Sequence, residues 1–482
     1  MKAATSPKIE LDTCPLAPQK RLHRAVLSLL LTDVGALGWS AMMAFGIRRC
    51  FDLNLDWQLY VSLLPAVFLF PVAYITTDLY PGFGLGPVEE LRRISYATSL
   101  VYVIVAAGSF MFKGGQDLSR GVFVIAWILS IVSVSLGRAA LRKSLSAHNW
   151  WGYSVVIIGA GTTGQMVTEF LLKRPELGLR PIVMLDDDRR KWGSFQGVPV
   201  FGGTDRAASL ARTYGLTYAI LAMPGATRSV LLTILEKNAH AFRHVLLIPD
   251  LFGLSSLWVT TKDLDGVLGL ELRERLLLPH CRIAKRAIDI VLVLSAGILL
   301  LPLFILIAIV IKLESEGPVF FGHARIGRFG KKFTAWKFRS MVKNADECLT
   351  QYLNQHPEMR ASWERDQKLK NDPRLTRIGR LLRKSSLDEL PQLINVLKGE
   401  MSLVGPRPII ESEIKRYGAH FRLYTKVLPG LTGLWQVSGR NNLTYTRRVE
   451  LDSYYVLNWS VWLDIYILAV TIKVVLNGDG AY

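Results

Sequence analysis

The most prominent pattern in the chain is a series of apolar stretches separated by short polar segments. Four of them approach the ~20 residues that a membrane-crossing helix needs, and they occupy residues 25–47, 58–77, 94–112 and 121–137. Pro65 and Pro71 lie in the second stretch and predict a kink there. We therefore predict a cytoplasmic N-terminal tail at residues 1–24 and a four-helix transmembrane bundle at residues 25–143. Buried helices of a large soluble domain are the alternative.

Basic residues flank these stretches unevenly. They lie before the first stretch, between the second and third, and after the fourth: Lys20, Arg21, Arg24, Arg92, Arg93, Arg138, Arg142 and Lys143. The positive-inside rule then predicts that both ends of the bundle face the cytoplasm. Arg48 and Arg49 oppose this orientation, although acidic residues share their loop. No small-residue cleavage site follows the first stretch, so we expect no cleaved signal peptide.

A strand, a glycine turn and a helical segment follow the apolar stretches. The strand at residues 153–158 leads into Gly159, Gly161 and Gly164, and a second strand at residues 182–185 ends at Asp186. Further strand patterns occur at residues 218–222 and 244–248. This order is typical of dinucleotide-binding folds, so we predict a Rossmann-like α/β domain at residues 150–275.

The same glycines and Asp186 are candidates for binding a nucleotide cofactor. Glycine at these positions also permits a tight turn and close helix–strand packing without any ligand. The segment contains no Tyr/Lys or Cys/His arrangement suited to catalysis. We interpret the domain as structural or regulatory, with nucleotide binding left open.

A fifth apolar run, residues 288–311, contains Pro302 and lies between basic residues. Residues 312–482 contain 27 Lys+Arg and 17 Asp+Glu, a difference of +10, and a fifth crossing would export this basic segment from the cytoplasm. We therefore predict a re-entrant membrane helix at residues 282–312 that bends near Pro302, followed by a mostly helical catalytic domain at residues 313–482. A plain fifth transmembrane helix is the alternative.

Composition narrows the class of partner. Half of the residues are hydrophobic, yet the net charge is +19, and the mean hydropathy is +0.27. Such apolarity excludes an ordinary soluble nucleic-acid binder and favours anionic lipid headgroups or phosphorylated substrates. The four cysteines are too far apart to indicate a disulfide framework or a zinc site.

Candidate chemistry is concentrated in the last third of the chain. Asp388 and Glu389 follow two serines that we expect to cap a helix with both acids in its first turn. The cations Lys337, Arg339, Arg383 and Arg407 occur in neighbouring motifs, and Arg407 lies in a rigid Gly-Pro-Arg-Pro loop that ends at Pro408. Carboxylates among cations could hold Mg²⁺ and a diphosphate, with one carboxylate attacking phosphorus. Solvated charge at a helix start is the alternative.

Six motifs in order resemble the bacterial sugar transferase family, the monotopic polyprenol-phosphate hexose-1-phosphate transferases. They comprise Lys285-Arg286-x-x-Asp289, the Pro302 helix, residues 337–341 (KFRSM), residues 386–392 (SLDELPQ), residues 398–408 (KGEMSLVGPRP) and residues 429–440 (PGLTGLWQVSGR). The match covers about residues 282–482, and the segments before it resemble the long form of that family. Lys426 stands where members often carry Arg, which leaves that contact in doubt.

The resemblance implies an inner-membrane enzyme that moves a hexose-1-phosphate from a UDP-sugar to undecaprenyl phosphate and releases UMP. It implies Asp388 as nucleophile and Mg²⁺ ligand, Glu389 as its assistant, and phosphate-binding or site-shaping roles for Arg407, Pro408, Arg383, Lys337 and Arg339. Galactose is the expected sugar and glucose the alternative, with surface polysaccharide assembly as the pathway. A homodimer is also compatible with this architecture.

Other readings remain at this point. A membrane-tethered enzyme that modifies nucleotide sugars would use the glycine turn, and a non-enzymatic scaffold would use the acid pair only as a helix start. The apolar, aromatic-rich residues 454–476, which include Asp464, suit either an interfacial helix or ordinary core packing.

Overall fold

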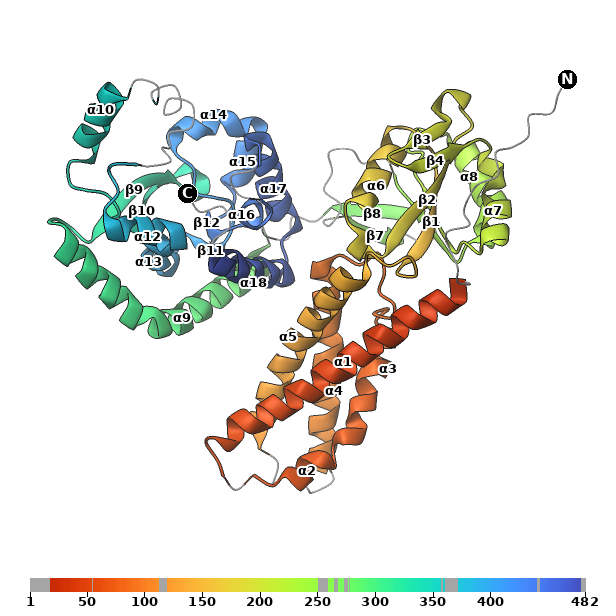
Figure 1. Cartoon of the computed structure of the whole chain (residues 1–482), viewed down its shortest axis with the longest axis horizontal. Coiled ribbons are helices and arrows are strands. Elements are labelled where there is room, and N and C mark those ends of the chain that lie inside the picture. Colours follow the sequence, from red (N-terminus) through yellow and green to blue (C-terminus); the bar gives the residue numbers. More distant parts are fainter. Residues whose placement is uncertain are drawn as a thin grey trace. The chain divides into compact units, whose positions relative to one another are not determined.

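The computed structural model describes residues 18–477, apart from residues 54, 112–118, 250–258, 264–267, 273–275, 277, 357–358, 360–371 and 440–442. The chain divides into two compact units, residues 1–252 and residues 253–482. The first combines long helices with an α/β sheet, and the second is a mainly helical unit with short strands (Figure 1). The chain is therefore a mixed helical and sheet protein, as predicted.

Long apolar helices open the first unit. They are α1 (Pro18–Arg49), α2 (Trp57–Val61), the 3₁₀ turn η1 (Leu64–Phe68), α3 (Leu69–Thr76), α4 (Pro87–Met111) and α5 (Arg120–Leu145). The predicted interruption of the second stretch is present, because α2 ends before Pro65 and Pro65 lies in η1. By length and hydropathy, four described segments could cross a membrane: Leu22–Arg49, Trp57–Thr76, Arg120–Leu145 and Pro279–Glu314.

A buried ion cluster joins three of these helices. Arg138 on α5 is fully buried and donates from Nε and Nη2 to the two carboxylate oxygens of Asp33 on α1, at 2.8 and 2.6 Å. Its Nη1 donates to the Leu79 carbonyl at 3.0 Å and to Glu90 on α4 at 3.3 Å. The charged pairs inside this bundle are therefore matched by partners, as burial of charge requires.

The α/β part of the first unit contains a six-stranded sheet. Its elements are β1 (Tyr153–Ile158), α6 (Thr162–Leu172), β2 (Leu179–Leu185), β3 (Gly193–Phe195), β4 (Val198–Phe201), α7 (Ala207–Tyr214), β5 (Tyr218–Leu221), α8 (Arg228–Asn238) and β6 (His244–Leu247). The strand order is β3-β4-β2-β1-β5-β6, and every pairing except β3–β4 is parallel. Alternate residues of β1 enter opposite cores: Val156 and Ile158 pack with α7 and α8, whereas Val155 and Ile157 pack on the α6 side.

The second unit begins with a hairpin, β7 (Val259–Asp263) and β8 (Leu268–Leu272), and the long helix α9 (Pro279–Glu314). Its remaining elements are β9 (Phe320–Ile326), β10 (Lys332–Phe338), α10 (Ala345–Gln355), α12 (Arg377–Ser385), η11 (Leu387–Glu389), α13 (Gln392–Lys398), β11 (Ser402–Val404), α14 (Ile414–Tyr417), α15 (Phe421–Tyr424), β12 (Gly430–Thr432), α16 (Leu434–Val437), α17 (Tyr445–Asn458) and α18 (Val461–Asn477).

Both ends of α9 are attached to the rest of the second unit. Near its start, Asp289 accepts hydrogen bonds from Ser402 Oγ at 2.7 Å and from the Leu403 N–H at 3.2 Å. At its end, the Glu314 carboxylate accepts from the Arg377 N–H at 2.7 Å, and Ile311 is fully buried in a core cluster. Pro302 lies inside the helix, and Figure 1 draws α9 as a curved rod whose two ends return to one unit.

The expected single stretch at residues 454–476 is instead divided between α17 and α18. Asp464 on α18 is buried and accepts hydrogen bonds from Lys285 Nζ, Tyr455 OH and Trp459 Nε1, at 2.8, 2.7 and 2.9 Å. Asp464 thus joins the start of α9 to the last two helices, which is a core-packing role.

Candidate active site

The acid pair lies in a tight turn between two helices. Ser386 adopts a left-handed conformation, with φ of 57°, and ends α12. Asp388 and Glu389 follow in the 3₁₀ turn η11, before α13 begins at Gln392. The prediction of a serine cap was wrong, because Ser386 makes no side-chain capping bond and Ser385 Oγ donates backward to the Leu381 carbonyl at 2.8 Å.

Lys337 binds both acids. It is the penultimate residue of β10, and its Nζ donates to Asp388 Oδ2 at 3.3 Å and to Glu389 Oε1 at 2.6 Å. The Asp388 side chain is 10% exposed, whereas those of Lys337 and Glu389 are 28% and 34% exposed. The structure therefore brings these three predicted residues together at a partly open surface, with Asp388 the most enclosed.

The two carboxyl groups are shifted in opposite directions. Burial raises the pKa of Asp388, and the nearby Glu389 adds to that rise, although Lys337 and Arg383 oppose it. Burial acts on Glu389 as well, but Lys337, Arg407 and Arg325 hold the pKa of Glu389 below its usual value. Burial disfavours the charge on Lys337, yet the two acids outweigh it and raise the pKa of Lys337. Asp388 is consequently the more basic carboxylate of the pair, which favours nucleophilic behaviour once it is ionised.

Two further predicted cations have different positions. Arg383, near the end of α12, donates from Nε to Ser340 Oγ at 3.0 Å and acts electrostatically on Asp388. Arg339 is directed elsewhere: its guanidinium donates to the Glu316 and Ser315 carbonyls at 2.8 and 2.7 Å. Arg339 therefore holds the segment after α9, and its expected role at the acid pair stays a prediction.

The Gly-Pro-Arg-Pro loop follows β11, which pairs in parallel with β12. Gly405 and Gly430 approach so closely that a Cβ on either would meet the other's backbone within 2.8 Å, and the Gly430 N–H donates to the Pro406 carbonyl at 2.8 Å. This contact fixes the loop. Burial lowers the pKa of Arg407, and Glu389 is among the charges that act on it. The Pro408 carbonyl accepts from Arg325 Nη1 at 3.4 Å.

The structure adds residues that the sequence analysis did not identify. Arg325 on β9 acts on Glu389, and Trp435 lies against two guanidinium groups, with Cζ of Arg407 and Arg448 at 5.3 and 4.9 Å from its ring centroid. Arg325 and Arg448 are far from the acid pair in sequence and lie outside the motifs considered there, so no local pattern marks them. Trp435 lies in the motif of residues 429–440, whose final residue Arg440 lies outside the described residues.

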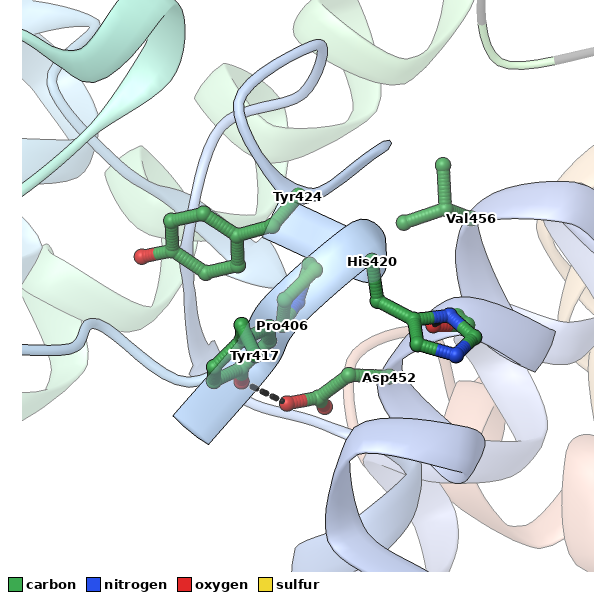
Figure 2. Close-up of a pocket in the computed structure, with 7 residues that line it drawn as sticks. Pro406, Tyr417, His420, Tyr424, Asp452 and Val456 are labelled. Atoms are coloured by element: carbon green, nitrogen blue, oxygen red, sulfur yellow. Dashed lines mark hydrogen bonds between the residues drawn. The ribbon is translucent and has the colours of Figure 1, made fainter. Parts of the chain in front are cut away.

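A small pocket lies behind this loop. Figure 2 shows Pro406, His420 and Tyr424 around it, with the Tyr417 hydroxyl pointing at Asp452. That hydroxyl donates to Asp452 Oδ2 at 2.7 Å. Burial raises the pKa of Asp452 to about 7, against the lowering effects of Tyr417, Arg448 and Arg407.

The donor set allows a partial Mg²⁺ site only. In the part of the chain that the structure describes, no group of three or more His, Cys, Asp or Glu side chains could hold a metal. Asp388 and Glu389 are adjacent carboxylates, and Mg²⁺ is often held by one or two carboxylates together with substrate phosphates. The acid pair fits that kind of site, in which the substrate completes the coordination.

The glycine turn of the α/β sheet is explained largely by packing. Gly159 has a φ of 106°, and a Cβ on Gly164 would meet the Gly159 carbonyl oxygen at 1.9 Å. Asp186 accepts from the Ala160 N–H at 2.8 Å and from Lys191 Nζ at 2.9 Å. A Cβ on Gly161 would meet only Lys191 Nζ, at 4.0 Å. Asp186, a candidate for nucleotide binding, is therefore hydrogen-bonded within its own domain.

Comparison with known proteins gives two family matches. The bacterial sugar transferase family matches residues 280–478, and a CoA-binding domain family matches residues 77–249. The UDP-galactose-lipid carrier transferase of Erwinia amylovora is 39% identical over 399 residues, with 82% of each chain covered. The undecaprenyl-phosphate galactose phosphotransferase of Salmonella typhimurium is 39% identical over 396 residues, also with 82% of each chain covered.

A third relative is more distant. The UDP-glucose:undecaprenyl-phosphate glucose-1-phosphate transferase of Escherichia coli is 32% identical over 430 residues, covering 86% of this chain and 88% of the relative. The family match, together with the carboxylate pair among cations and the apolar helices, indicates a membrane-associated transferase. The chain belongs to the bacterial sugar transferase family, as the sequence motifs indicated.

Proposed function

We propose that this enzyme transfers galactose-1-phosphate from UDP-galactose to undecaprenyl phosphate and releases UMP, as a first step of surface polysaccharide assembly. The names of the two relatives at 39% identity support the galactose donor and the lipid-phosphate acceptor. The observation that carries the chemistry is the enclosed Asp388 with its raised pKa, held by Lys337 beside Glu389.

In this proposal, Asp388 Oδ attacks the sugar-bearing phosphorus of the donor. The phosphorus–oxygen bond to UMP breaks, and UMP leaves with the electron pair. The aspartyl phosphosugar then transfers its phosphorus to the acceptor phosphate oxygen and regenerates the carboxylate. Lys337 orients the acid pair, Arg383 and Arg407 offset phosphate charge, and the rigid loop ending at Pro408 holds Arg407 in place.

Mg²⁺ is part of the proposal as a cofactor. Asp388 would hold it with the donor diphosphate, and the ion would neutralise charge on the phosphate oxygens when bound. Titration of the wild-type enzyme with EDTA, followed by Mg²⁺ return, tests this requirement.

We also propose that α9 is re-entrant and that the catalytic unit faces the cytoplasm at the inner membrane. A 36-residue helix is about 54 Å long when straight, well beyond the ~30 Å hydrocarbon core. Both ends of α9 contact the same unit. A helix that simply crossed the membrane would place its two ends on opposite sides of the bilayer. We interpret the mostly parallel sheet with helices on both faces as a Rossmann-like structural or regulatory domain. A homodimer stays a prediction, which light scattering of the purified enzyme checks.

The proposed reaction is tested with purified enzyme, Mg²⁺, undecaprenyl phosphate and radiolabelled donor. We expect UMP release and lipid-linked product with wild type and neither with Asp388→Asn. The enzyme is also incubated with labelled donor in the absence of acceptor and then denatured. Labelled sugar phosphate should remain on a peptide that contains residue 388. Label on the lipid without any protein adduct, together with an active Asp388→Asn variant, contradicts the assignment. UDP-glucose in place of UDP-galactose tests the alternative donor.

A further inference from the structure

Several buried N–H donors next to the Gly-Pro-Arg-Pro loop have no acceptor among the residues that the structure describes. Arg448 on α17 is 7% exposed, and no described residue accepts a hydrogen bond from its Nε or Nη2. The indole Nε1 of Trp435, which is 6% exposed, is unpaired among the described residues as well. Buried donors without partners cost about 1–3 kcal/mol each, and more when charged, so their clustering calls for an explanation.

Two buried guanidinium groups lie close together beside these donors. Arg407 and Arg448 lie against the same Trp435 ring, and after burial Arg448 is the main influence that lowers the pKa of Arg407. Glu413 contacts Arg448 Nη1 at 3.5 Å, but its other oxygen is engaged by the Ile410 N–H at 3.1 Å. Glu413, Asp452 and Glu389 also act electrostatically on these arginines, but among the described residues the long contact with Glu413 is the one ion pair of either guanidinium.

We propose that Arg448 and Arg407 form a two-arginine subsite beside Trp435 that binds one phosphate group of a substrate. This inference rests on the proposed function and assigns Arg448 a binding role. A phosphate oxyanion would supply acceptors for the open donors of Arg448 and neutralise the repulsion between the two arginines. Glu389 acts electrostatically on Arg407, which relates the subsite to the acid pair.

Two sources of phosphate fit this chemistry, namely the diphosphate of the nucleotide-sugar donor and the phosphate of the lipid acceptor. Steady-state kinetics that vary each substrate separately distinguish them. Arg448→Gln should raise the KM for one of the two by about 10- to 100-fold, the loss expected for charge-assisted hydrogen bonds, while the other KM changes little. Arg448→Lys keeps the charge but loses the bidentate guanidinium geometry. Its KM for that substrate should lie between those of wild type and Arg448→Gln.

Arg416→Gln is the matched control. Arg416 Cζ lies 5.2 Å from the Tyr445 ring, the same ring that Arg448 approaches at 5.1 Å, but Arg416 is exposed. This variant should leave both KM values unchanged. A fall in kcat for Arg448→Gln with both KM values intact overturns the proposal.

Chemical labelling of wild-type enzyme tests the subsite without turnover or mutation. Phenylglyoxal modification, mapped by mass spectrometry with and without inorganic phosphate, should show protection of Arg448 and Arg407 together and none of Arg416. Equal modification of Arg448 under both conditions overturns the subsite. If phosphate protects the pair but no UDP-sugar supports UMP release, the proposed function fails and the subsite stands.

Discussion

Lys337 donates hydrogen bonds to both Asp388 and Glu389, at 3.3 and 2.6 Å, across more than fifty residues of sequence. The ammonium group allows two adjacent carboxyl groups to coexist in an enclosed turn. It also opposes the rise that burial causes in the pKa of each acid, although the pKa of Asp388 stays raised. Lys337 therefore sets how much of the proposed nucleophile is ionised at a given pH.

Replacement of Lys337 should change the pH profile as well as the rate. In Lys337→Met the pKa of Asp388 rises further, so the acid limb of kcat/KM should move to higher pH and the maximum should fall by roughly 100-fold or more. Lys337→Arg should restore part of the rate and most of the profile. Lys332→Met is the control, because Lys332 on the same strand pairs with exposed Glu411. An unshifted acid limb in Lys337→Met contradicts this role.

Arg339→Gln should affect folding more than catalysis. Its guanidinium bonds the Ser315 and Glu316 carbonyls rather than the acid pair, so removal breaks two part-buried charge-assisted hydrogen bonds at a cost of about 1–3 kcal/mol. We expect a lower melting temperature in detergent and a kcat per folded enzyme close to wild type. A near-complete loss of kcat in a variant with unchanged melting temperature would restore the original expectation for Arg339.

Asp452 should give the enzyme a pH-dependent stability. Its folded-state pKa of about 7 lies above the ordinary 3.8, so its stabilising contribution is complete below about pH 4 and is lost as the pH rises through 7. Asp452→Asn mimics the protonated form. The variant's melting temperature should therefore gain on wild type between pH 5 and pH 8, by an amount equivalent to about 1–4 kcal/mol. Glu450→Gln, an exposed pair with Arg447, should show no such trend. A constant difference across that range excludes the titration.

The buried ion cluster of the helix bundle should be sensitive to removal of one partner. Arg138→Met leaves Asp33 buried without its bidentate partner and should cost about 3–5 kcal/mol. The double variant Arg138→Met/Asp33→Asn should recover part of this loss in thermal unfolding. Arg92→Met breaks the partly exposed pair with Glu89 and should cost at most about 1 kcal/mol. Equal effects of Arg138→Met and Arg92→Met would contradict the importance of burial.

The elements with strong local signals were predicted well. The glycine turn and the following helix are present, with α6 ending at Leu172, because strand alternation and glycine geometry are local properties. The pairing of Lys337 with the acid pair also agrees with the expectation from the motifs. Arg339, by contrast, directs its guanidinium to the Ser315 and Glu316 carbonyls. The strand ends at Phe338, and the Arg339 N–H bonds the Val319 carbonyl at 2.9 Å instead.

The contributions of Arg325, Arg448 and Glu413 could not be predicted from sequence. Each depends on tertiary contacts among β9, the Gly-Pro-Arg-Pro loop and α17, and a single charged residue carries no periodic signal. The prediction of a serine cap was wrong for a related reason. Ser386 was read as the start of a helix, whereas its left-handed conformation ends the previous one.

The attachment of both ends of α9 to one unit has a consequence for how the enzyme meets its substrates. With a re-entrant α9, release from the bilayer would require breaking the contacts of Asp289 and Glu314 or extracting the helix together with its unit. The enzyme would then meet its lipid acceptor by lateral diffusion in the plane of the membrane. The soluble nucleotide sugar would reach it by three-dimensional diffusion through the cytoplasm.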